Sequence, residues 1–341
     1  MARDADDMTV TSLLKVSVVI PCHDAAPYLR VTVASVLNQT VRNVEVIIVD
    51  DASSDGGGDI ADSLAKEFET VRVFHRSFRH AGRTRRFGAA HATGDAIVFL
   101  DADDVIAPEN FAVQTVALAN GADIAAVPWC RLTRRGREWH STPPSCRQRR
   151  PGEDALSAWL RGWYYPPASL MWRRAVYEAG EGWSETVRIN DDGELVMRTL
   201  ARGAILSELH DGCSWYRRLP PGEASLSSAG KTREGMDDRL SVVDSVAADL
   251  KREGKLGRYR TALAESYHMI ATDARSSELP GVEALAAARA AACRPSYASA
   301  LLMGIQRRAM AIGKTYRGLP LPKPGYLGMP GPEVETLAAN E

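Results

Sequence analysis

The amino-acid sequence predicts an α/β fold, in which a mostly parallel sheet has helices on both faces and a helical extension follows at the C-terminal end. Short apolar runs of strand length alternate with helical patterns through the first half of the chain, as in parallel strands joined by right-handed crossovers. Beyond about Arg233 only helical patterns remain. The 341 residues suffice for one large domain of this kind with a smaller appendage.

The individual elements are expected from local patterns. An apolar, β-branched run bounded by turn residues predicts a strand, and apolar residues at every third or fourth position predict a helix. Pro21 ends the first strand, Pro27 begins the first helix, and Ser54 or Asp55 caps the second. We expect strands at 16–20, 44–49, 71–74, 96–100, 123–127, 169–172, 204–209 and 214–217. We expect further helices at 82–91, 108–119, 153–160, from 191 onward, and at 236–252, 259–274 and 282–292.

The stretch 96–104 is the centre of the predicted site. Five apolar residues, which read as a buried strand, end abruptly in Asp101, Asp103 and Asp104. Ligands of open α/β sheets bind beyond the carboxyl ends of the strands, and three acids placed there repel one another unless they share a cation. Their oxygen atoms suit Mg²⁺ or Mn²⁺, with a substrate diphosphate completing the coordination. The alternative is an acidic turn that caps a helix beginning near Pro108.

The overall composition excludes several classes of protein. A net charge of −1 provides no global positive field, so we expect no nucleic-acid partner. The five cysteines are scattered without a CxxC pair, which favours a reducing cytoplasm over a disulfide framework or a zinc site. The polar N-terminus is unlike a secretory signal, and no apolar run is long enough to span a membrane. A dinucleotide enzyme or P-loop ATPase is disfavoured because both glycine-rich motifs are missing.

The domain organisation follows from changes in composition. We expect a flexible N-terminus at 1–14, the α/β domain at 15–230, a helical region at 231–317 and a disordered tail, rich in proline and glycine, at 318–341. The arginine-rich stretch 131–150 is expected to be an exposed loop or hairpin.

The helical region has one segment of particular character. Residues 301–317 mix apolar and basic side chains, as in a helix that lies at the inner face of a membrane, packs on the α/β domain or forms a homodimer.

Several short motifs stand in a characteristic order along the chain. They are Val-Ser-Val-Val-Ile-Pro at 16–21, Ser-Val-Leu-Asn-Gln-Thr at 35–40, Val-Asp-Asp-Ala-Ser-Ser-Asp at 49–55, Ala-Thr-Gly at 92–94 and Leu-Asp-Ala-Asp-Asp at 100–104. This succession, over about residues 15–220, resembles family-2 glycosyltransferases of the GT-A fold. The resemblance implies transfer of a sugar from a nucleotide-diphosphate donor to an acceptor hydroxyl, with inversion at the anomeric carbon.

The resemblance also implies where the nucleotide binds. Pro21 and His23 would border the nucleobase pocket, and Asp51 would accept a hydrogen bond from the base. Uracil fits this contact, so a UDP-sugar is the expected donor, with GDP- or dTDP-sugars as alternatives and an unknown acceptor. Asp51 could instead cap the turn that Ser53 and Ser54 begin.

The acids after the central strand match the D-x-D motif of the family. The resemblance makes Asp103 the direct metal ligand, places Asp101 nearer the ribose and leaves Asp104 either assisting or supporting. A cation at this place would stabilise the negative charge that develops on the departing nucleoside diphosphate. The expected cofactor is therefore Mg²⁺ or Mn²⁺.

Two arginines are candidates for phosphate contacts. Arg85 matches an arginine of the family and would meet the diphosphate, although Arg86 stands where the family has asparagine. Arg217 lies in a segment similar to the one that closes over the donor, and the alternative for it is a surface arginine. For Arg76, Arg79 and Arg83 the solvated face of a helix is preferred.

The pair Asp191 and Asp192 occupies the place of the family's Glu-Asp pair, which makes Asp192 the general base. An acidic neighbour and burial raise the pKa of a carboxyl group, and this favours proton acceptance near neutral pH. The alternative is a helix N-terminus, where the dipole stabilises acids. Arg198 could pair with these acids or contact donor phosphate. Trp163 and Tyr164 are candidates for stacking on an acceptor, although aromatic residues more often belong to the core.

Two other functions remain open from the sequence. A nucleotidyltransferase would also use carboxylate-bound Mg²⁺ on an α/β sheet, but it would need a glycine-rich lysine loop in place of Pro-Cys-His-Asp after the first strand. A catalytically silent nucleotide-sugar-binding protein would keep Asp51 and Asp103 and would not need Asp192.

Overall fold

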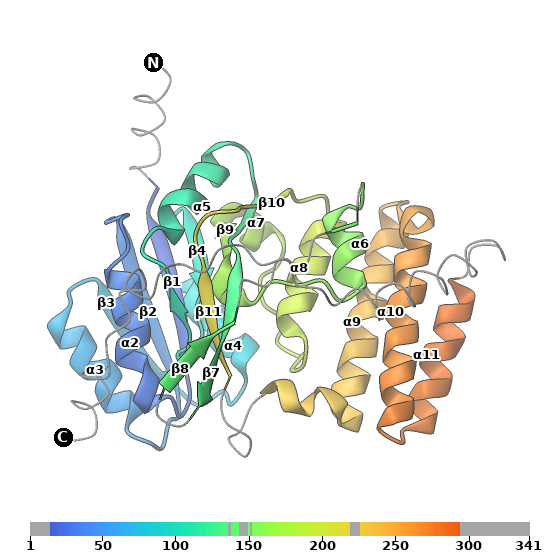
Figure 1. Cartoon of the computed structure of the whole chain (residues 1–341), viewed down its shortest axis with the longest axis horizontal. Helices are drawn as coiled ribbons and strands as arrows, with labels where there is room; N and C mark the ends of the chain where they lie inside the picture. The colour runs from blue at the N-terminus through green and yellow to red at the C-terminus, as the bar shows by residue number, and fades with distance from the viewer. Residues whose placement is uncertain (1–13, 136–137, 143–148, 151, 219–225, 294–341) are drawn as a thin grey trace.

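The computed structural model describes residues 14–135, 138–142, 149–150, 152–218 and 226–293 (Figure 1). Its main feature is a seven-stranded sheet with strand order β10-β6-β9-β4-β1-β2-β3. The strands are β1 (Val16–Cys22), β2 (Val44–Asp51), β3 (Val71–Arg76), β4 (Ala96–Phe99), β6 (Ile124–Ala126), β9 (Leu170–Arg173) and β10 (Leu206–Glu208). The helices of this part are α2 (Ala26–Leu37), α3 (Gly57–Glu67), α4 (Ala81–Ala90), α5 (Asn110–Ala119), α6 (Ala155–Leu160), α7 (Arg174–Ala179) and α8 (Asp191–Ala201).

The sheet is mostly parallel, as the alternation of strands and helices predicts. β1 pairs in parallel with β2 and β4, and β2 with β3, whereas β9 runs antiparallel between β4 and β6. The parallel strands are joined by helices that cross over the sheet. As a result, the carboxyl ends of β1, β2 and β4 meet at one edge, where the predicted nucleotide and metal residues lie.

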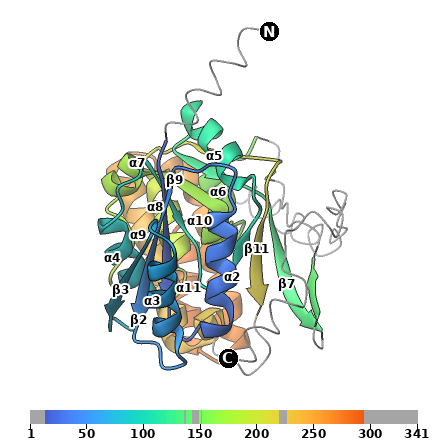
Figure 2. The same ribbon diagram turned by 90° about the vertical axis from the view of Figure 1, so that its left-hand side faces the viewer.

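Both faces of the sheet are covered, which explains the nearly continuous apolar strands. Val19, Ile47 and Phe99 pack in one core with side chains of α4, α6, α8 and the C-terminal helices. Val18 and Ile48, the alternate residues, pack in a second core with α2, α3 and α5. Figure 2 shows α2 and α3 in front of the sheet on this second face.

β1 continues further than the sequence predicts. Pro21 does not end it: the strand runs through Pro21 to Cys22, and Pro21 is in register with Val49 of β2. The pairing of β1 with β4 ends at Val19, so the last residues of β1 have a strand on one side only. Proline is tolerated at such an edge because no partner needs its missing N–H.

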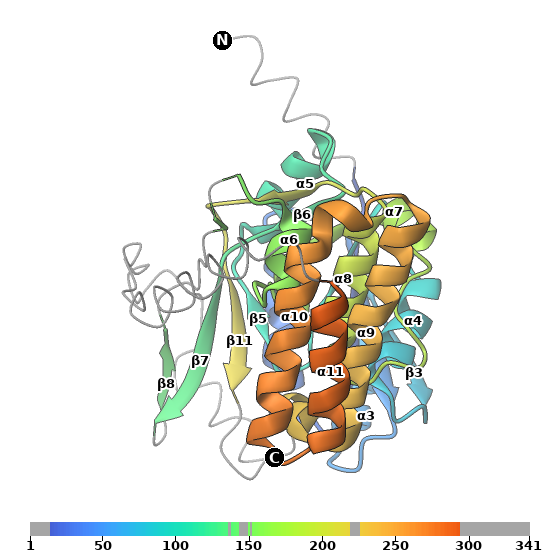
Figure 3. The ribbon, with the colours of Figure 1, turned by 90° about the vertical axis from the view of Figure 1, so that its right-hand side faces the viewer.

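A second, four-stranded sheet has the order β5-β11-β7-β8 and stands beside the large one (Figures 2 and 3). Its strands are β5 (Val105–Ile106), β11 (Ser214–Arg218), β7 (Trp129–Arg135) and β8 (Glu138–Ser141). The arginine-rich stretch therefore supplies a hairpin, one of the two expected forms. The sheet also brings the sulfur atoms of Cys130 and Cys213, both free thiols, to 3.2 Å from each other, which no sequence pattern predicts.

Three helices follow the sheets: α9 (Arg233–Arg252), α10 (Leu256–Ser276) and α11 (Pro280–Ala292), in good agreement with the helices expected at 236–252, 259–274 and 282–292. Figures 1 and 3 show that they stand side by side, with α8 between them and the large sheet. In the part of the chain that the structure describes, no helix is both long and apolar enough to cross a membrane. The expected segments 301–317 and 318–341, and residues 1–13, lie outside the described residues.

Candidate functional site

Arg85 connects the two acidic motifs that the sequence singles out. Its Nη2 donates to Asp101 Oδ1 at 2.6 Å, and its Nη1 donates to Asp191 Oδ2 at 3.1 Å. Asp101 follows β4, Asp191 begins α8, and Arg85 lies on α4, so three elements distant in sequence meet at one guanidinium. The fold thus joins the D-x-D turn to the predicted general-base motif.

The environment of Arg85 keeps it charged, although the side chain is buried. Its side chain is 6% exposed, and its guanidinium lies over the ring of Trp183 at 4.6 Å from the centroid. Burial alone would lower the pKa of Arg85, but the carboxylates of Asp101 and Asp191 outweigh it and raise the pKa. Both terminal nitrogens already serve carboxylates, so the expected diphosphate contact would have to share this guanidinium.

Asp191 and Asp192 form the first turn of α8. They follow Asn190, whose backbone is left-handed with φ 63°, a conformation that asparagine tolerates better than most residues. Asp191 Oδ1 accepts from the backbone N–H of Asp192 at 3.0 Å, and Asp192 Oδ1 accepts from that of Gly193 at 2.8 Å. The helix-start interpretation is therefore confirmed, because these acids form the first turn of α8, and Asp191 also contacts Arg85.

Asp191 and Asp192 differ in the number of carboxylate oxygens that accept hydrogen bonds. Burial raises the pKa of Asp191 to about 7, against the opposing effect of Arg85, and Asp192 and Asp101 raise it further. Burial also raises the pKa of Asp192. Both Asp191 oxygens are engaged, whereas no hydrogen bond from the described residues reaches Asp192 Oδ2. Asp192 is therefore the acid of the pair with an oxygen available to accept a proton.

The D-x-D turn is attached to β11 of the small sheet. The backbone N–H of Arg217 donates to Asp104 Oδ1 at 2.8 Å, and Arg217 Nε donates to the carbonyl oxygen of Asp103 at 2.6 Å. Asp104 is fully buried, and burial, then Asp103 and Asp101, raise its pKa well above the usual range. These contacts favour a supporting role for Asp104, the second of its two expected roles.

Arg217 is not a surface arginine, so that alternative is wrong. Its side chain is 5% exposed, and its guanidinium is close to two rings, at 4.6 Å from the centroid of Tyr28 and 4.4 Å from that of Trp139. Tyr28 comes from α2 and Trp139 from the arginine-rich hairpin. This places a fixed positive charge beside Asp103, where a phosphate group is expected.

The acidic turn fits a divalent cation whose coordination is completed by substrate. Burial, then the charge of Asp101, raise the pKa of Asp103 to about 6, which indicates negative charge that the protein does not fully compensate. No group of three or more His, Cys, Asp or Glu side chains in the described residues is arranged to hold a metal. Mg²⁺ sites typically use one or two carboxylates together with phosphates and water. Asp103 is suited to such a site, and Asp101 is shared with Arg85.

The predicted nucleobase residues lie together at the ends of β1 and β2. His23 Nδ1 is 2.8 Å from the carbonyl oxygen of Asp51. The Asp51 carboxylate accepts from the backbone N–H groups of Arg79 and His80 at 2.8 and 3.0 Å, and from Thr84 Oγ1 at 2.9 Å. Burial would raise the pKa of Asp51, but these hydrogen bonds outweigh it and lower the pKa.

The Asp51 carboxylate thus organises the start of α4, which leaves little of it for a base. The alternative, that it caps the turn at Ser53 and Ser54, is wrong. Asp50 Oδ1 accepts from the Ser53 N–H at 3.2 Å instead, and Asp24 Oδ1 accepts from the Ser54 N–H at 2.7 Å.

Arg86, which replaces the family's asparagine, binds the segment that leads to α8. Its Nη1 donates to the carbonyl oxygens of Glu181 and Trp183 at 2.5 and 3.1 Å. Arg83 Nε also donates to the carbonyl oxygen of Glu185 at 3.0 Å, so this arginine is not simply solvated. Helix α4 therefore holds residues 181–185 through two arginines.

Gly82 permits this close approach of the helix and the segment. A Cβ at Gly82 would lie 2.7 Å from the carbonyl oxygen of Ser184 and 3.5 Å from Asp191 Oδ2. A substituted residue would have to displace backbone, which is why a glycine fits here.

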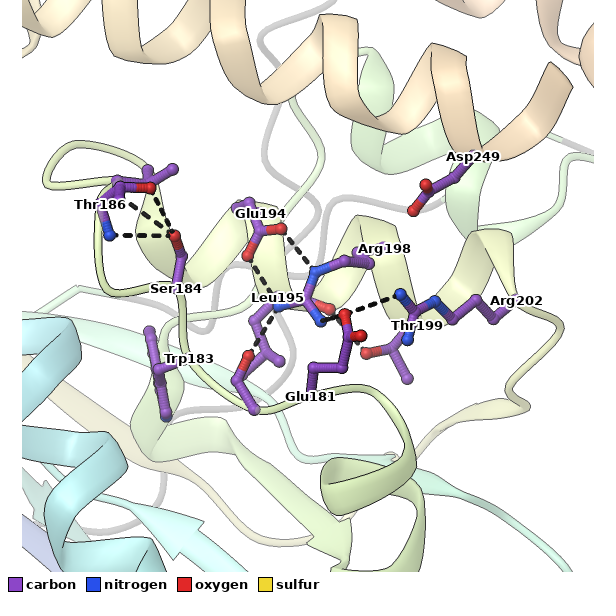
Figure 4. A network of polar contacts seen from close by, with 12 residues as sticks. Glu181, Trp183, Ser184, Thr186, Glu194, Leu195, Arg198, Thr199, Arg202 and Asp249 are labelled. Atoms are coloured by element: carbon purple, nitrogen blue, oxygen red, sulfur yellow. Dashed lines mark hydrogen bonds and ion pairs between the residues drawn. The ribbon is translucent and has the colours of Figure 1, made fainter. Parts of the chain in front are cut away.

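Two further expectations are corrected by the structure. Arg198 does not pair with Asp191 or Asp192: it donates to both oxygens of Glu194, at 2.6 and 2.9 Å, and to the carbonyl oxygen of Gly182 at 2.6 Å (Figure 4). Trp163 is 6% exposed and belongs to the core, so it cannot stack on an acceptor. Tyr164 remains a candidate, since it is 39% exposed.

No sequence pattern indicates His80 or Asp238 as residues of the site. His80 caps α4, is 6% exposed, and its Nε2 is buried without a hydrogen-bond partner in the described residues. Asp238 of α9 binds the backbone just before α8. A histidine before a glycine-containing helix and an acid on an amphipathic helix are too common to signal such roles.

A hollow of about 390 Å³ lies away from these acids, between α5 and β10. It is lined by Val113, Val116, Ala117, Asn120, Gly121, Ala122, Ile205, Ser207 and Leu209. None of these side chains titrates, so the hollow offers no group for acid–base chemistry and is not the candidate site.

The fold is similar to that of solved glycosyltransferases. Staphylococcus aureus TarS (residues 1–349) aligns with a TM-score of 0.60 and 18% identity, over 77% of this chain and 73% of that chain. Mannosyltransferase PcManGT from Pyrobaculum calidifontis, solved with GDP-Man and Mn²⁺, aligns with a TM-score of 0.56 and 20% identity, over 96% of this chain and 86% of that chain. These likenesses confirm the GT-A fold with its C-terminal helices.

Sequence comparison matches part of the chain to a known family. The family model of Glycosyl transferase family 2 matches residues 17–180, which include Arg85 and the D-x-D motif and end before Asp191. The uncharacterized glycosyltransferase YibD of Escherichia coli (strain K12) is 34% identical over 155 residues, 45% of this chain and 44% of that protein. The uncharacterized glycosyltransferase alr2836 of Nostoc sp. (strain PCC 7120) is 29% identical over 231 residues, 65% of this chain and 70% of that protein.

Residues 17–180 of the chain therefore match glycosyltransferase family 2, as the order of the motifs predicts. The chain spans less than half the length of YibD. This match gives no support to the alternative of a nucleotidyltransferase.

Proposed function

We propose that this protein is a metal-dependent, inverting glycosyltransferase, which moves a sugar from a nucleotide-diphosphate donor to an acceptor hydroxyl with Asp192 as general base. The observation that carries the proposal is the position of Arg85 between Asp101 and Asp191, at 2.6 and 3.1 Å. A binding protein needs the D-x-D turn alone. A transferase needs that turn and a proton acceptor at the same place. The contacts of Arg85 with Asp101 and Asp191 support such an arrangement.

The chemical step uses Asp192, whose Oδ2 accepts no hydrogen bond from the described residues. Asp192 accepts the proton of the acceptor hydroxyl as its oxygen forms a bond to the anomeric carbon. The bond from that carbon to the donor diphosphate breaks, and its electron pair leaves with the nucleoside diphosphate. Attack opposite the leaving group inverts the anomeric centre. A raised pKa of Asp192 suits this role, because a base works best when its pKa is near the operating pH.

The other residues bind and orient. Arg85 places one positive charge between Asp101 and Asp191, which reduces the repulsion between these two acids and the donor phosphates. Arg217 contributes a second positive charge beside Asp103. Mg²⁺ or Mn²⁺, held mainly by Asp103, would act as a Lewis acid toward the departing diphosphate.

The donor is proposed to bind with its base beside Pro21, His23 and Asp51. Structural neighbours support a nucleotide sugar: TarS has been solved with UDP-GlcNAc, with a TM-score of 0.57 and 16% identity, and PcManGT with GDP-Man and Mn²⁺. We favour a UDP-sugar, with a GDP- or dTDP-sugar as the alternative. The cytoplasmic location expected from the cysteine content is part of the same proposal.

The test is to separate chemistry from binding. Asp192→Asn should lose release of nucleoside diphosphate from UDP-GlcNAc or GDP-mannose, whichever the wild type uses with Mn²⁺, while the thermal shift produced by that donor stays the same. Asp211→Asn, at an exposed acid, is the matched control and should behave as wild type. Unchanged turnover in Asp192→Asn would reject this base. A wild type that binds donor without any turnover would support the silent binding protein.

A further inference from the structure

The C-terminal helices contact the segment that precedes the proposed base. Asp238, in the second turn of α9, accepts two hydrogen bonds through the same oxygen, Oδ2. The donors are the backbone N–H groups of Arg188 at 2.9 Å and Ile189 at 3.0 Å. Only the left-handed Asn190 separates these residues from Asp191 and Asp192. The family model ends at residue 180, so neither this segment nor α9 lies in the matched part.

The segment between α7 and α8 is held from two sides. Arg83 and Arg86 of α4 bind the carbonyl oxygens of Glu185, Glu181 and Trp183, which are its first half. Asp238 binds the second half, nearest to α8. The two sets of contacts use opposite backbone groups, carbonyl oxygens on the α4 side and N–H groups on the α9 side. The last residues before the catalytic turn therefore depend on α9 for their position.

We propose that Asp238 is a positioning residue: through residues 188 and 189 it sets where α8 begins, and so where the Asp192 carboxylate points. This inference rests on the proposed role of Asp192. It gives the C-terminal helices a part in the reaction, since one of them completes the support of the base. Misplacement of a catalytic group by about 1 Å can lower the rate by about 100-fold.

The contact geometry makes a sharp set of variants possible. Because one oxygen accepts both hydrogen bonds, the amide oxygen of Asp238→Asn can still accept them, whereas Asp238→Ala cannot. The neighbouring Asp237 is exposed and pairs with Arg233 on its own helix, at 3.2 Å, without touching the segment. Asp237→Ala is therefore the matched control on the same turn of α9.

We expect Asp238→Ala to lower kcat by about 10- to 100-fold with a donor KM within about threefold of wild type, because donor contacts are untouched. Asp238→Asn should recover most of kcat, and Asp237→Ala should equal wild type. The proposal is overturned if Asp238→Ala keeps its kcat. It is also overturned if the loss appears in KM alone, or if Asp238→Asn is as impaired as Asp238→Ala.

A second measurement does not depend on activity. Hydrogen exchange of the peptide covering residues 186–192 should be faster in Asp238→Ala than in wild type and in Asp237→Ala, with α9 itself unchanged. Equal exchange in all three proteins would overturn the positioning role. If the wild type turned over no donor, the proposed function would fail, and the exchange experiment would still decide whether Asp238 holds this segment.

Discussion

Arg85 and Asp191 are 106 residues apart in sequence and 3.1 Å apart in the structure. The same guanidinium holds Asp101, so it is the shared counter-ion of two acidic motifs that would otherwise repel one another. Two hydrogen bonds in different directions require the planar fork of arginine.

Arg85→Lys is expected to lower turnover by about 100-fold or more, because the single ammonium nitrogen of a shorter side chain cannot contact both carboxylates at these distances. Unfolding by denaturant should show a loss of about 3 kcal/mol, since one buried acid is left without its partner. Arg30→Lys is the control, because the pair of Arg30 with Glu67 is exposed and should matter little. Equal effects of the two substitutions would contradict the bridging role.

Turnover is expected to depend on a divalent cation, and Asp103 and Asp104 are expected to differ in their importance for it. Excess chelator should abolish turnover, and Mn²⁺ or Mg²⁺ should restore it. Asp103→Asn should remain inactive at metal concentrations that saturate the wild type, because it loses the carboxylate that is suited to the ion. Asp104→Asn should keep turnover within a few-fold, because an amide oxygen can still accept from the Arg217 N–H. Full activity in chelator, or equal loss in both variants, would disprove the assignment.

The lowered pKa of the Glu45 carboxyl group predicts how the free energy of unfolding depends on pH. Burial would raise its pKa, but hydrogen bonds from Ser17, Thr93 and Lys15 outweigh it and lower the pKa to about 2. A folded-state pKa below the unfolded one means that the stabilisation is fully present above the unfolded value of 4.5 and is lost as pH falls toward 2.

Glu45→Gln should therefore be less stable than wild type at pH 7, with a difference that shrinks between about pH 5 and pH 2. Urea unfolding at a series of pH values measures this, with Glu69→Gln, at an exposed glutamate, as the control. A gap between variant and wild type that is constant with pH would show that Glu45 acts by packing alone.

Gly82→Ala should destabilise the protein by about 1–3 kcal/mol and lower turnover, because its Cβ would lie 2.7 Å from the carbonyl oxygen of Ser184. Gly257→Ala makes the same substitution in a helix with no atom within 4 Å, and should be neutral or stabilising by up to about 1 kcal/mol. Denaturant unfolding and donor turnover measure both. If Gly82→Ala were as stable and active as Gly257→Ala, close packing of α4 on residues 181–185 would not matter.

The sequence predicts the sheet well because each buried strand is a nearly continuous apolar run that ends in polar residues. The acids at 101–104 stand out because they directly follow such an apolar run. Because the carboxyl ends of parallel strands face one edge of the sheet, these acids are expected at the ligand-binding edge. β5 is too short, with two residues, to leave any periodic pattern. The segment 181–190 forms no helix or strand, so its position depends on partners that only the fold brings near.

The site is predicted less completely than the sheet. Motif order identifies Arg85, Asp103 and Asp192 as candidates, but not that Arg85 bridges Asp101 and Asp191. Arg217 reads equally well as a surface residue, because its partners Tyr28 and Trp139 lie far away in the sequence. Such contacts depend on tertiary packing and not on local pattern.

The attachment of Asp104 to the backbone of β11 has a mechanical consequence. The acidic turn cannot shift without moving the second sheet, so the Asp103 carboxylate that we propose as the metal ligand is in place before any substrate arrives. Little free energy is then needed to reorganise the acidic turn during the reaction. Any adjustment to different donors would have to occur in other parts of the chain.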